Sequence, residues 1–388
     1  MAKLIGNAPN QISTNGDLGS MAFEDKKNYA TTSSPIYQPF RNIIINGDMS
    51  IAQRGTSVSS ITTGGYKTLD RFDLILDSLG TWTMSQDTDV PTGQGFAKSL
   101  KLDCTSADGS PSAGDRFLLR QQFEGQNLQY LKKGTSNASS LTASFWVKSV
   151  KTGTYIVQIA DLDNTRSISK SYTINSANTW EKKTITFDGD TTGTLDNDNN
   201  SSLSLSFWLG AGSTWSSGTL QTSWGNEVYA NIAVGQVNLA DSTSNEWYIT
   251  GVQLEAGQVA SDFEFLPFDV NYKRCQRYYQ RIQASTSDEV AIGMGYSDTT
   301  SGIRYYHTLS TTMRGIPSAS ENGLRTLGRA TLQETVDINA VFDVASENPE
   351  VVGLDLAASS GTPFTQFDAQ MIRLDDLDNA YLEFNAEL

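Results

Sequence analysis

The sequence predicts an all-β protein, in which two β-sandwich domains follow an extended N-terminal arm. Only 38% of the residues are apolar and 18% are charged, and Ser, Thr, Gly, Asn and Gln supply much of the remainder. This composition is poor in the residues that favour long helices, whereas its Thr, Tyr, Trp and Phe suit pleated strands. The second observation is a succession of short segments in which apolar and polar residues alternate, separated by polar turns. No tandem repeat is visible, which disfavours a propeller or a solenoid.

Residues 1–40 differ from the rest of the chain, because they hold few large apolar side chains and many Asn, Gly, Ser and Pro residues. Such a segment cannot bury enough apolar surface to offset the entropy that it loses on ordering. One short amphipathic patch interrupts it, formed by Leu18, Met21 and Phe23. We expect an extended arm that orders against a partner through these three side chains. A disordered leader is the alternative.

Residues 41–268 show the short strands and polar turns that are typical of sandwiches and jelly rolls. The clearest alternating segments are residues 141–147, 154–159, 167–174, 180–187, 203–209, 227–234 and 246–254. In two of them, 141–147 and 203–209, every second residue is apolar, so one face of the strand should feed a core. The opposite face of each is polar except for one tryptophan, Trp146 in the first segment and Trp208 in the second.

The remainder of the chain predicts a connector and a smaller β domain. Residues 262–268 are typical of an exit strand, and residues 269–281 form the connector, with a short helix expected over 270–279. In residues 282–388 the alternation resumes, at 290–294, 303–307, 332–342, 351–356 and 380–388. We therefore predict a smaller C-terminal β-sandwich, which serves for trimerisation or faces a receptor.

Several segments resemble one known family. Residues 42–56 (NIIINGDMSIAQRGT) and 66–72 resemble the opening of a jelly-roll domain that is common in phage tail-fibre and other virion proteins. Residues 144–148, the strand that begins at Trp180, residues 248–257 and the junction 275–279 (CQRYY) match the same family. The domain is similar to carbohydrate-binding modules of the jelly-roll type. Residues 5–10 and 19–25 resemble N-terminal segments of structural proteins from marine phages, especially those that infect cyanobacteria.

This resemblance implies a protein of the phage virion that is assembled in the host cytoplasm. It implies a homotrimer, attached through the arm to other tail or capsid proteins, and often recognition of a glycan on the host surface. We expect a tail fibre or another receptor-binding component. The alternatives are a virion component that binds no receptor, such as a capsid decoration, head fibre, collar or baseplate protein, and, third, a polysaccharide depolymerase.

The net charge and the two cysteines exclude several kinds of partner and of site. A net charge of −15 repels phosphate backbones and anionic lipid headgroups, so nucleic acid and membranes are not expected partners. No apolar run is long enough for a membrane span, and no secretory signal is visible. Cys104 and Cys275 fall in different predicted domains, so we expect no disulfide, and two thiols cannot complete a zinc site.

The residue types that enzymes use for catalysis do not form a recognisable pattern in this sequence. His307 is the sole histidine, which leaves one imidazole for acid–base chemistry or metal binding, and its strand context favours a structural role. No Gly-rich phosphate loop stands between a strand and a helix. Carboxylate pairs that could hydrolyse a glycosidic bond occur by chance among 43 acidic residues. We therefore expect no catalytic residues.

Calcium is the one cofactor that we consider. Jelly-roll modules of the resembled type often hold a structural calcium ion, and Asn46, Asp48 and Glu255 occupy positions from which such ligands would come. Carboxylate and amide oxygens are the donors that Ca²⁺ prefers. The alternative is that residues 46–48 form a turn in which the Asn side chain bonds to the backbone.

Four tryptophans are candidates for glycan binding, because aromatic rings stack on the C–H faces of sugars. Trp146 and Trp208 should project from the polar faces of their strands, and Trp215 and Trp224 belong to a loop rich in Gly, Ser and Thr at 210–225. An exposed aromatic ring among hydroxyl and amide groups is typical of a binding site. Alternatively, the two strand tryptophans lie under loops or at a subunit interface.

Overall fold

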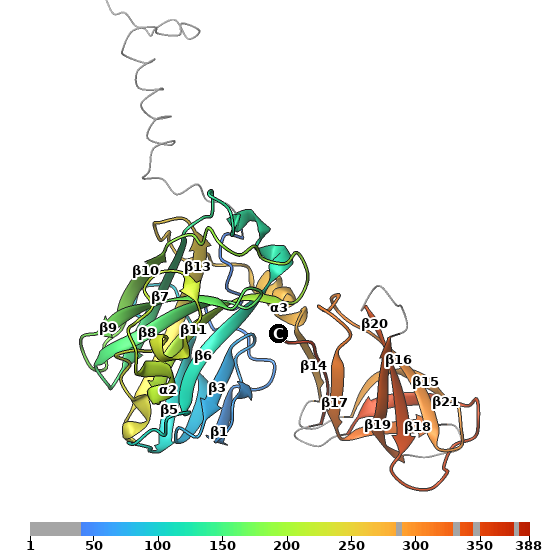
Figure 1. Cartoon of the computed structure of the whole chain (residues 1–388). Coiled ribbons are helices and arrows are strands. Elements are labelled where there is room, and N and C mark those ends of the chain that lie inside the picture. Colours follow the sequence, from blue (N-terminus) through green and yellow to red (C-terminus); the bar gives the residue numbers. More distant parts are fainter. Residues whose placement is uncertain (1–39, 285–288, 329–333, 344–349, 376–379) are drawn as a thin grey trace, which may run out of the picture. The chain divides into compact units, whose positions relative to one another are not determined.

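The computed structural model describes residues 40–284, 289–328, 334–343, 350–375 and 380–388 (Figure 1). It confirms the all-β class, and Asn42–Leu388 form one compact unit that contains two separate β cores. The predicted arm patch of Leu18, Met21 and Phe23 lies outside the described residues. No helix among the described residues is long and apolar enough to cross a membrane.

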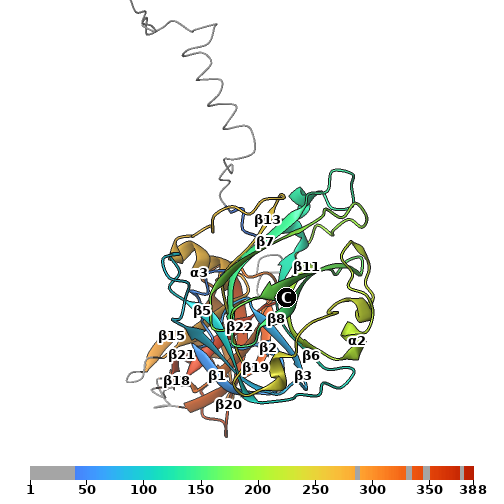
Figure 2. The same ribbon diagram turned by 90° about the vertical axis from the view of Figure 1, so that its left-hand side faces the viewer.

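The first core lies between two antiparallel sheets, which together form the jelly-roll sandwich (Figures 1 and 2). The strands of the six-stranded sheet, in pairing order, are β1 (Ser57–Ile61), β4 (Thr81–Asp87), β5 (Ser99–Ser106), β13 (Glu246–Ala256), β7 (Leu141–Ser149) and β10 (Glu181–Phe187). Those of the seven-stranded sheet are β12 (Gly225–Asn226), β9 (Arg166–Ile174), β8 (Gly153–Asp161), β11 (Ser201–Ala211), β6 (Arg116–Glu124), β3 (Asp73–Asp77) and β2 (Gly65–Tyr66).

The predicted alternation of buried and outward-facing side chains is confirmed in the two strands where it was clearest in the sequence, β7 and β11. The side chains of Leu141, Ala143, Phe145 and Val147 on β7 are buried in the core between the sheets. So are those of Leu203, Leu205, Phe207 and Leu209 on β11. Each strand therefore turns one face inward, as a period of two residues requires.

The segments that connect the strands contain short helices. These are η1 (Gly125–Asn127), η2 (Gln129–Leu131), α2 (Ser213–Ser216), η3 (Tyr229–Asn231) and η4 (Leu239–Asp241). The strand predicted over residues 227–234 is wrong, since this segment makes the turn η3 and buries the consecutive residues Ile232 and Ala233. No residue of 227–234 pairs with a neighbouring strand. Residues 262–267 are likewise not a strand.

A helix links the sandwich to the second core, as the sequence predicted. This helix, α3 (Phe268–Gln276), is followed by β14 (Tyr279–Gln283) in a three-stranded sheet with β22 (Tyr381–Asn385) and β17 (Ser318–Asn322). The carboxylate of Glu124 at the end of β6 accepts hydrogen bonds from Nε and Nη2 of Arg277, both at 2.7 Å, and from the Tyr278 hydroxyl at 2.5 Å. The CQRYY segment therefore anchors the connector to the sandwich.

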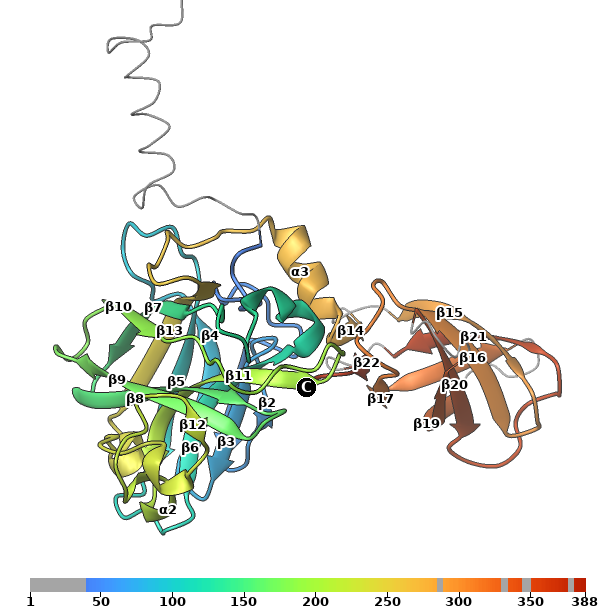
Figure 3. The ribbon, with the colours of Figure 1, turned by 45° about the horizontal axis from the view of Figure 1, so that its top comes forward.

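The remaining C-terminal strands close into a barrel (Figure 3). In pairing order they are β15 (Val290–Ser297), β16 (Gly302–Thr308), β20 (Val351–Ala358), β19 (Glu334–Asp343), β18 (Leu324–Gly328) and β21 (Ala369–Leu374). The sequence predicted a sandwich for this region, and closure is another way for strands with one apolar face to bury it. A closed sheet also leaves no unpaired edge strand. On β22 the predicted apolar face is buried through Leu382 and Phe384.

Candidate functional site

Trp208 does not project into solvent as expected. Its side chain is only 2% exposed and packs with Leu118, Ile156, Ile232 and Ala233 in a small cluster on the outer face of the seven-stranded sheet. Its indole Nε1 donates a hydrogen bond to Oε1 of Gln158 at 3.1 Å. The ring is therefore inaccessible to a ligand, and the alternative that it lies under a loop is the correct one.

Trp215 on α2 lies directly above this cluster and forms an aromatic platform with Tyr229 of η3. The ring centroids of Trp215 and Tyr229 are 5.0 Å apart, and that of Trp208 lies 5.8 Å from Trp215. The indole Nε1 of Trp215 donates to the Gly114 carbonyl at 3.1 Å, which fixes the orientation of the ring. Tyr229 is 54% exposed and Trp215 is partly exposed, so the platform offers aromatic surface to solvent.

A charged pair borders the platform. The guanidinium carbon of Arg116 lies 4.9 Å from the centroid of the Trp215 ring, within the range of a cation–π contact. Arg116 also pairs through Nε with Oδ2 of Asp77 at 2.5 Å, and the two side chains are 37% and 51% exposed. Hydrogen-bond donors and acceptors therefore stand at the edge of an apolar surface.

A row of polar side chains crosses the same sheet next to the buried Trp208. Strand pairing aligns Asp73 with Arg120, Arg120 with Ser206, and Ser206 with Gln158. The amide Nε2 of Gln158 donates to Glu227 at 3.1 Å, and Arg120 Nε pairs with Asp73 at 2.8 Å. Burial raises the pKa of both Asp73 and Glu227 above the ordinary carboxyl values. This face is thus polar in its centre and aromatic at one end.

The other two candidate tryptophans lie elsewhere, so the four do not make one site. The Trp224 Nε1 donates to the Asp188 carbonyl at 2.7 Å, and its ring lies 5.1 Å from the ammonium of Lys133. Trp146 is partly exposed on the outer face of the other sheet, where Lys182 and Thr250 are its cross-strand neighbours.

Sequence reasoning missed Tyr229, Arg116 and Glu227. Tyr229 and Glu227 fell in the segment that was predicted as a strand, and Arg116 is a single charged residue in a sequence that has many. The one available signal was the aromatic content of residues 215–229 within a polar loop.

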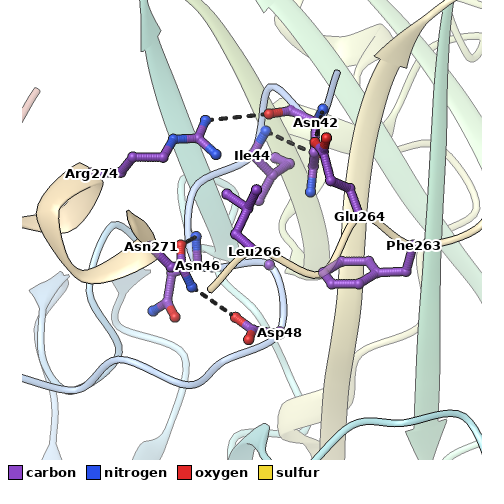
Figure 4. Close-up of a pocket in the computed structure, with 10 residues that line it drawn as sticks. Asn42, Ile44, Asn46, Asp48, Phe263, Glu264, Leu266, Asn271 and Arg274 are labelled. Carbon is purple, nitrogen blue, oxygen red and sulfur yellow. Dashed lines mark hydrogen bonds between the residues drawn. The ribbon is translucent and has the colours of Figure 1, made fainter. Parts of the chain in front are cut away.

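Asn46 and Asp48 lie in one loop, but the structure uses them for hydrogen bonds within the protein (Figure 4). The Asn46 Oδ1 accepts from the Ile51 amide at 2.9 Å, and its Nδ2 donates to the carbonyls of Ile51 and Asp70. A Cβ on Gly47 would lie 2.0 Å from the Val252 carbonyl oxygen, so glycine is required there. This is the turn with a bonded Asn side chain that the sequence left open.

Glu255 is likewise used for hydrogen bonds within the protein. Its carboxylate accepts from the backbone amide of Ser261 at 2.8 Å and from the Ser261 hydroxyl at 2.7 Å. The pocket beside Asn46 and Asp48 has a volume of about 10 Å³, room for about one water molecule. No three His, Cys, Asp or Glu side chains gather to hold a metal within the described part of the chain. The side chains of Asn46, Asp48 and Glu255 thus have partners within the protein, and a structural calcium ion stays a prediction.

His307 and the two cysteines have structural roles, since their side chains pack inside the protein. The Nδ1 of His307 and the Tyr305 hydroxyl are 2.8 Å apart, and the imidazole stacks on Phe384 with centroids 4.9 Å apart. Burial lowers the pKa of His307 to about 4. Cys104 and Cys275 are both buried free thiols.

Comparison with known proteins finds only distant structural likenesses. No family model and no curated protein matches the chain. Among solved structures, the enzymatically active domain of tailspike protein 4 from bacteriophage CBA120 is similar at 14% identity and a TM-score of 0.30, over 56% of this chain and 22% of that chain. This chain thus spans about a fifth of the length of the tailspike domain.

Two smaller proteins are matched over nearly their whole length. A Bacteroides thetaiotaomicron protein described as sugar-binding is 12% identical, with a TM-score of 0.31, over 55% of this chain and 99% of that chain. The family 11 carbohydrate-binding module of Clostridium thermocellum is 10% identical, with a TM-score of 0.27, over 53% and 98%. With identities and TM-scores this low, the likeness carries no conclusion about function, which has to rest on this chain's own residues.

Proposed function

We propose that the protein recognises carbohydrate through the platform of Trp215 and Tyr229, without catalysing a reaction. The observation that carries the proposal is the 54% exposed ring of Tyr229, packed on Trp215 above the buried Trp208. Three aromatic rings in tilted contact hold the exposed rings in place, so little entropy is lost when a sugar stacks on them. Arg116 and Asp77 at the edge supply a donor and an acceptor for hydroxyl groups.

The geometry of the polar row favours binding over hydrolysis. Asp73 lies on β3 and the partner of Glu227, Gln158, lies on β8, with β6 and β11 between them. Three strand spacings, about 14 Å, separate the backbones of Asp73 and Gln158. The two carboxyl groups of a glycoside hydrolase are about 5–9.5 Å apart. Asp73 is also paired with Arg120, so its carboxylate is already engaged within the protein.

The wider role that we propose is that of a tail fibre or another receptor-binding component of a phage virion. It rests on the sequence resemblance of residues 42–56 and 275–279, and it includes attachment by the N-terminal arm and a homotrimeric state. In such a protein the carbohydrate ligand would be a glycan on the host surface.

A glycan array followed by titration calorimetry tests the binding function. Tyr229→Ala removes exposed aromatic surface without touching a core, and we expect about tenfold weaker binding, equivalent to about 1.4 kcal/mol. Tyr130→Ala is the matched control, since Tyr130 is 51% exposed and lies away from the platform. Equal affinity of both variants and the parent protein for every glycan that binds would refute the proposed site.

A further inference from the structure

The outer face of the six-stranded sheet carries a second set of aromatic side chains, which the platform of Trp215 and Tyr229 does not use. Strand pairing places Lys148 of β7 beside Tyr248 of β13, and Tyr248 beside Lys101 of β5. Trp180, just before β10, extends this row, since its ring centroid lies 6.2 Å from that of Tyr248. The row therefore alternates aromatic and cationic side chains across four strands.

Ion pairs and hydrogen bonds hold this row rigid. Lys148 lies 4.1 Å from the centroid of the Tyr248 ring and is paired with Asp89, to which Trp180 Nε1 also donates at 2.9 Å. Lys101 pairs with Glu246 at 2.7 Å, and the Tyr248 hydroxyl donates to the same carboxylate at 2.9 Å. The carboxylates of Asp89 and Glu246 are thus already bound to side chains of this row.

The neighbouring row contains the side chains that remain open to a ligand. Trp146 is partly exposed and stands in register between Lys182 of β10 and Thr250 of β13. Lys182 is exposed and takes part in none of the ion pairs formed among the described residues. In a chain with a net charge of −15, a lysine without a carboxylate partner beside an accessible indole is a local departure from the overall charge.

We propose that this face is a second, independent carbohydrate site, specific for a saccharide that carries carboxylate groups, that is, one containing uronic acid. The indole of Trp146 supplies the surface on which a sugar ring stacks, and Lys182 supplies the cation for its carboxylate. Lys148 and Lys101 on the adjacent row are paired with Asp89 and Glu246, so Lys182 is the cation that a ligand carboxylate meets on this face. The two sites lie on the outer faces of opposite sheets, so one chain binds two ligands at once.

The test uses short oligosaccharides, because the net negative charge of the protein repels a long polyanion. Trimers of galacturonate, glucuronate and mannuronate are titrated into the full chain, together with the neutral trimers in which a hydroxymethyl group replaces each carboxylate. We expect at least one uronate trimer to bind in preference to its neutral counterpart. Failure of all three uronate trimers to bind overturns the proposal.

Two variants separate stacking from charge. Trp146→Ala should weaken uronate binding about tenfold. Lys182→Gln should weaken it about two- to fivefold and leave any binding of the neutral trimer unchanged, since an exposed ion pair contributes about 1 kcal/mol or less. Lys132→Gln, at an exposed lysine elsewhere on the sandwich, is the matched control. Equal losses in the Lys182 and Lys132 variants would overturn the assigned cation.

The Tyr229→Ala variant distinguishes this site from the proposed platform. If it abolishes the binding of every saccharide, the second site does not exist, although the platform stands. If it leaves uronate binding intact while Trp146→Ala removes that binding, the second site is established whatever the platform binds. As a last measurement, analytical ultracentrifugation compares the oligomeric state of the Trp146→Ala variant with that of the parent protein. A change in oligomeric state would mean that a second copy of the chain covers this face, and it would overturn the proposal.

Discussion

At the scale of single residues, exposure and burial separate side chains that look alike in the sequence. Trp208 and Trp215 are seven positions apart, yet the first is a buried support and the second is part of an accessible platform. The same holds for charged residues, since Lys132 is exposed whereas its neighbour Lys133 is buried. Function and stability therefore depend on neighbours that the local sequence does not name.

Lys133 is predicted to be essential for stability. Its ammonium is 6% exposed and pairs with the buried carboxylates of Asp161 and Asp190. Lys133→Met leaves both carboxylates without this cation, and we expect a loss of about 3–5 kcal/mol in the free energy of unfolding, measured with urea. Lys132→Met is the control and should change it by about 0.5 kcal/mol or less. A similar effect of both substitutions would show that the buried pairs contribute nothing.

Asp70 is predicted to make stability depend on pH. Burial raises the pKa of this fully buried carboxyl to about 6, despite hydrogen bonds from Gln53. The folded protein thus holds this proton more tightly than the unfolded chain. The resulting stabilisation is complete below the ordinary aspartate pKa of about 4 and is lost as the pH rises through about 6.

Comparison with Asp70→Asn isolates this contribution from those of other carboxyl groups. The stability of the parent protein relative to the variant should be on the order of 2–3 kcal/mol greater at pH 3.5 than at pH 7.5, by urea unfolding. Asp269→Asn, at an exposed position, controls for the general effect of removing a carboxylate. A difference that stays constant with pH would contradict the prediction.

At the scale of elements, a buried carboxylate of the sandwich is one of the groups that hold the connector. Glu124 is 1% exposed and accepts four hydrogen bonds, two from Arg277, one from Tyr278 and one from Gln126. An amide at this position cannot accept both guanidinium bonds and carries no charge. We therefore expect Glu124→Gln to lower the free energy of unfolding by about 2–4 kcal/mol and to speed proteolysis within the connector.

The exposed pair of Asp77 and Arg116 provides the matched control for this prediction. Asp77→Asn also removes a carboxylate that binds an arginine, but here the side chains are 51% and 37% exposed. Surface pairs of this kind contribute about 0–1 kcal/mol. Equal changes in thermal midpoint for the two variants would mean that Glu124 does not anchor the connector.

At the scale of the whole molecule, net charge governs solubility. The formal charge of −15 at neutral pH opposes non-specific aggregation, and this repulsion disappears near the isoelectric point of about 4.5. We expect a solubility minimum near pH 4.5, measured as turbidity between pH 3.5 and 8. Solubility that does not change over this range would show that short-range contacts outweigh net charge.

The sequence by itself determined the all-β class and the inward faces of several strands. The alternation in β7, β11 and β22 has a period of two residues, which can be read without knowing what lies opposite. The helix α3 was predicted as well, from a segment that interrupts the alternation. These features are local, and local patterns are what a single sequence contains.

Tertiary structure alone decided which side chains are accessible. The loop of residues 212–237 folds back over the outer face of a sheet, so Trp208 is covered and Tyr229 is brought onto Trp215. The Asn46 side chain is hydrogen-bonded to Ile51 and to Asp70, which lies 24 residues away in the sequence. Strand order places Lys182 beside Trp146. Each of these outcomes depends on contacts between residues distant in the chain, and burial and charge pairing arise from such contacts rather than from the local pattern.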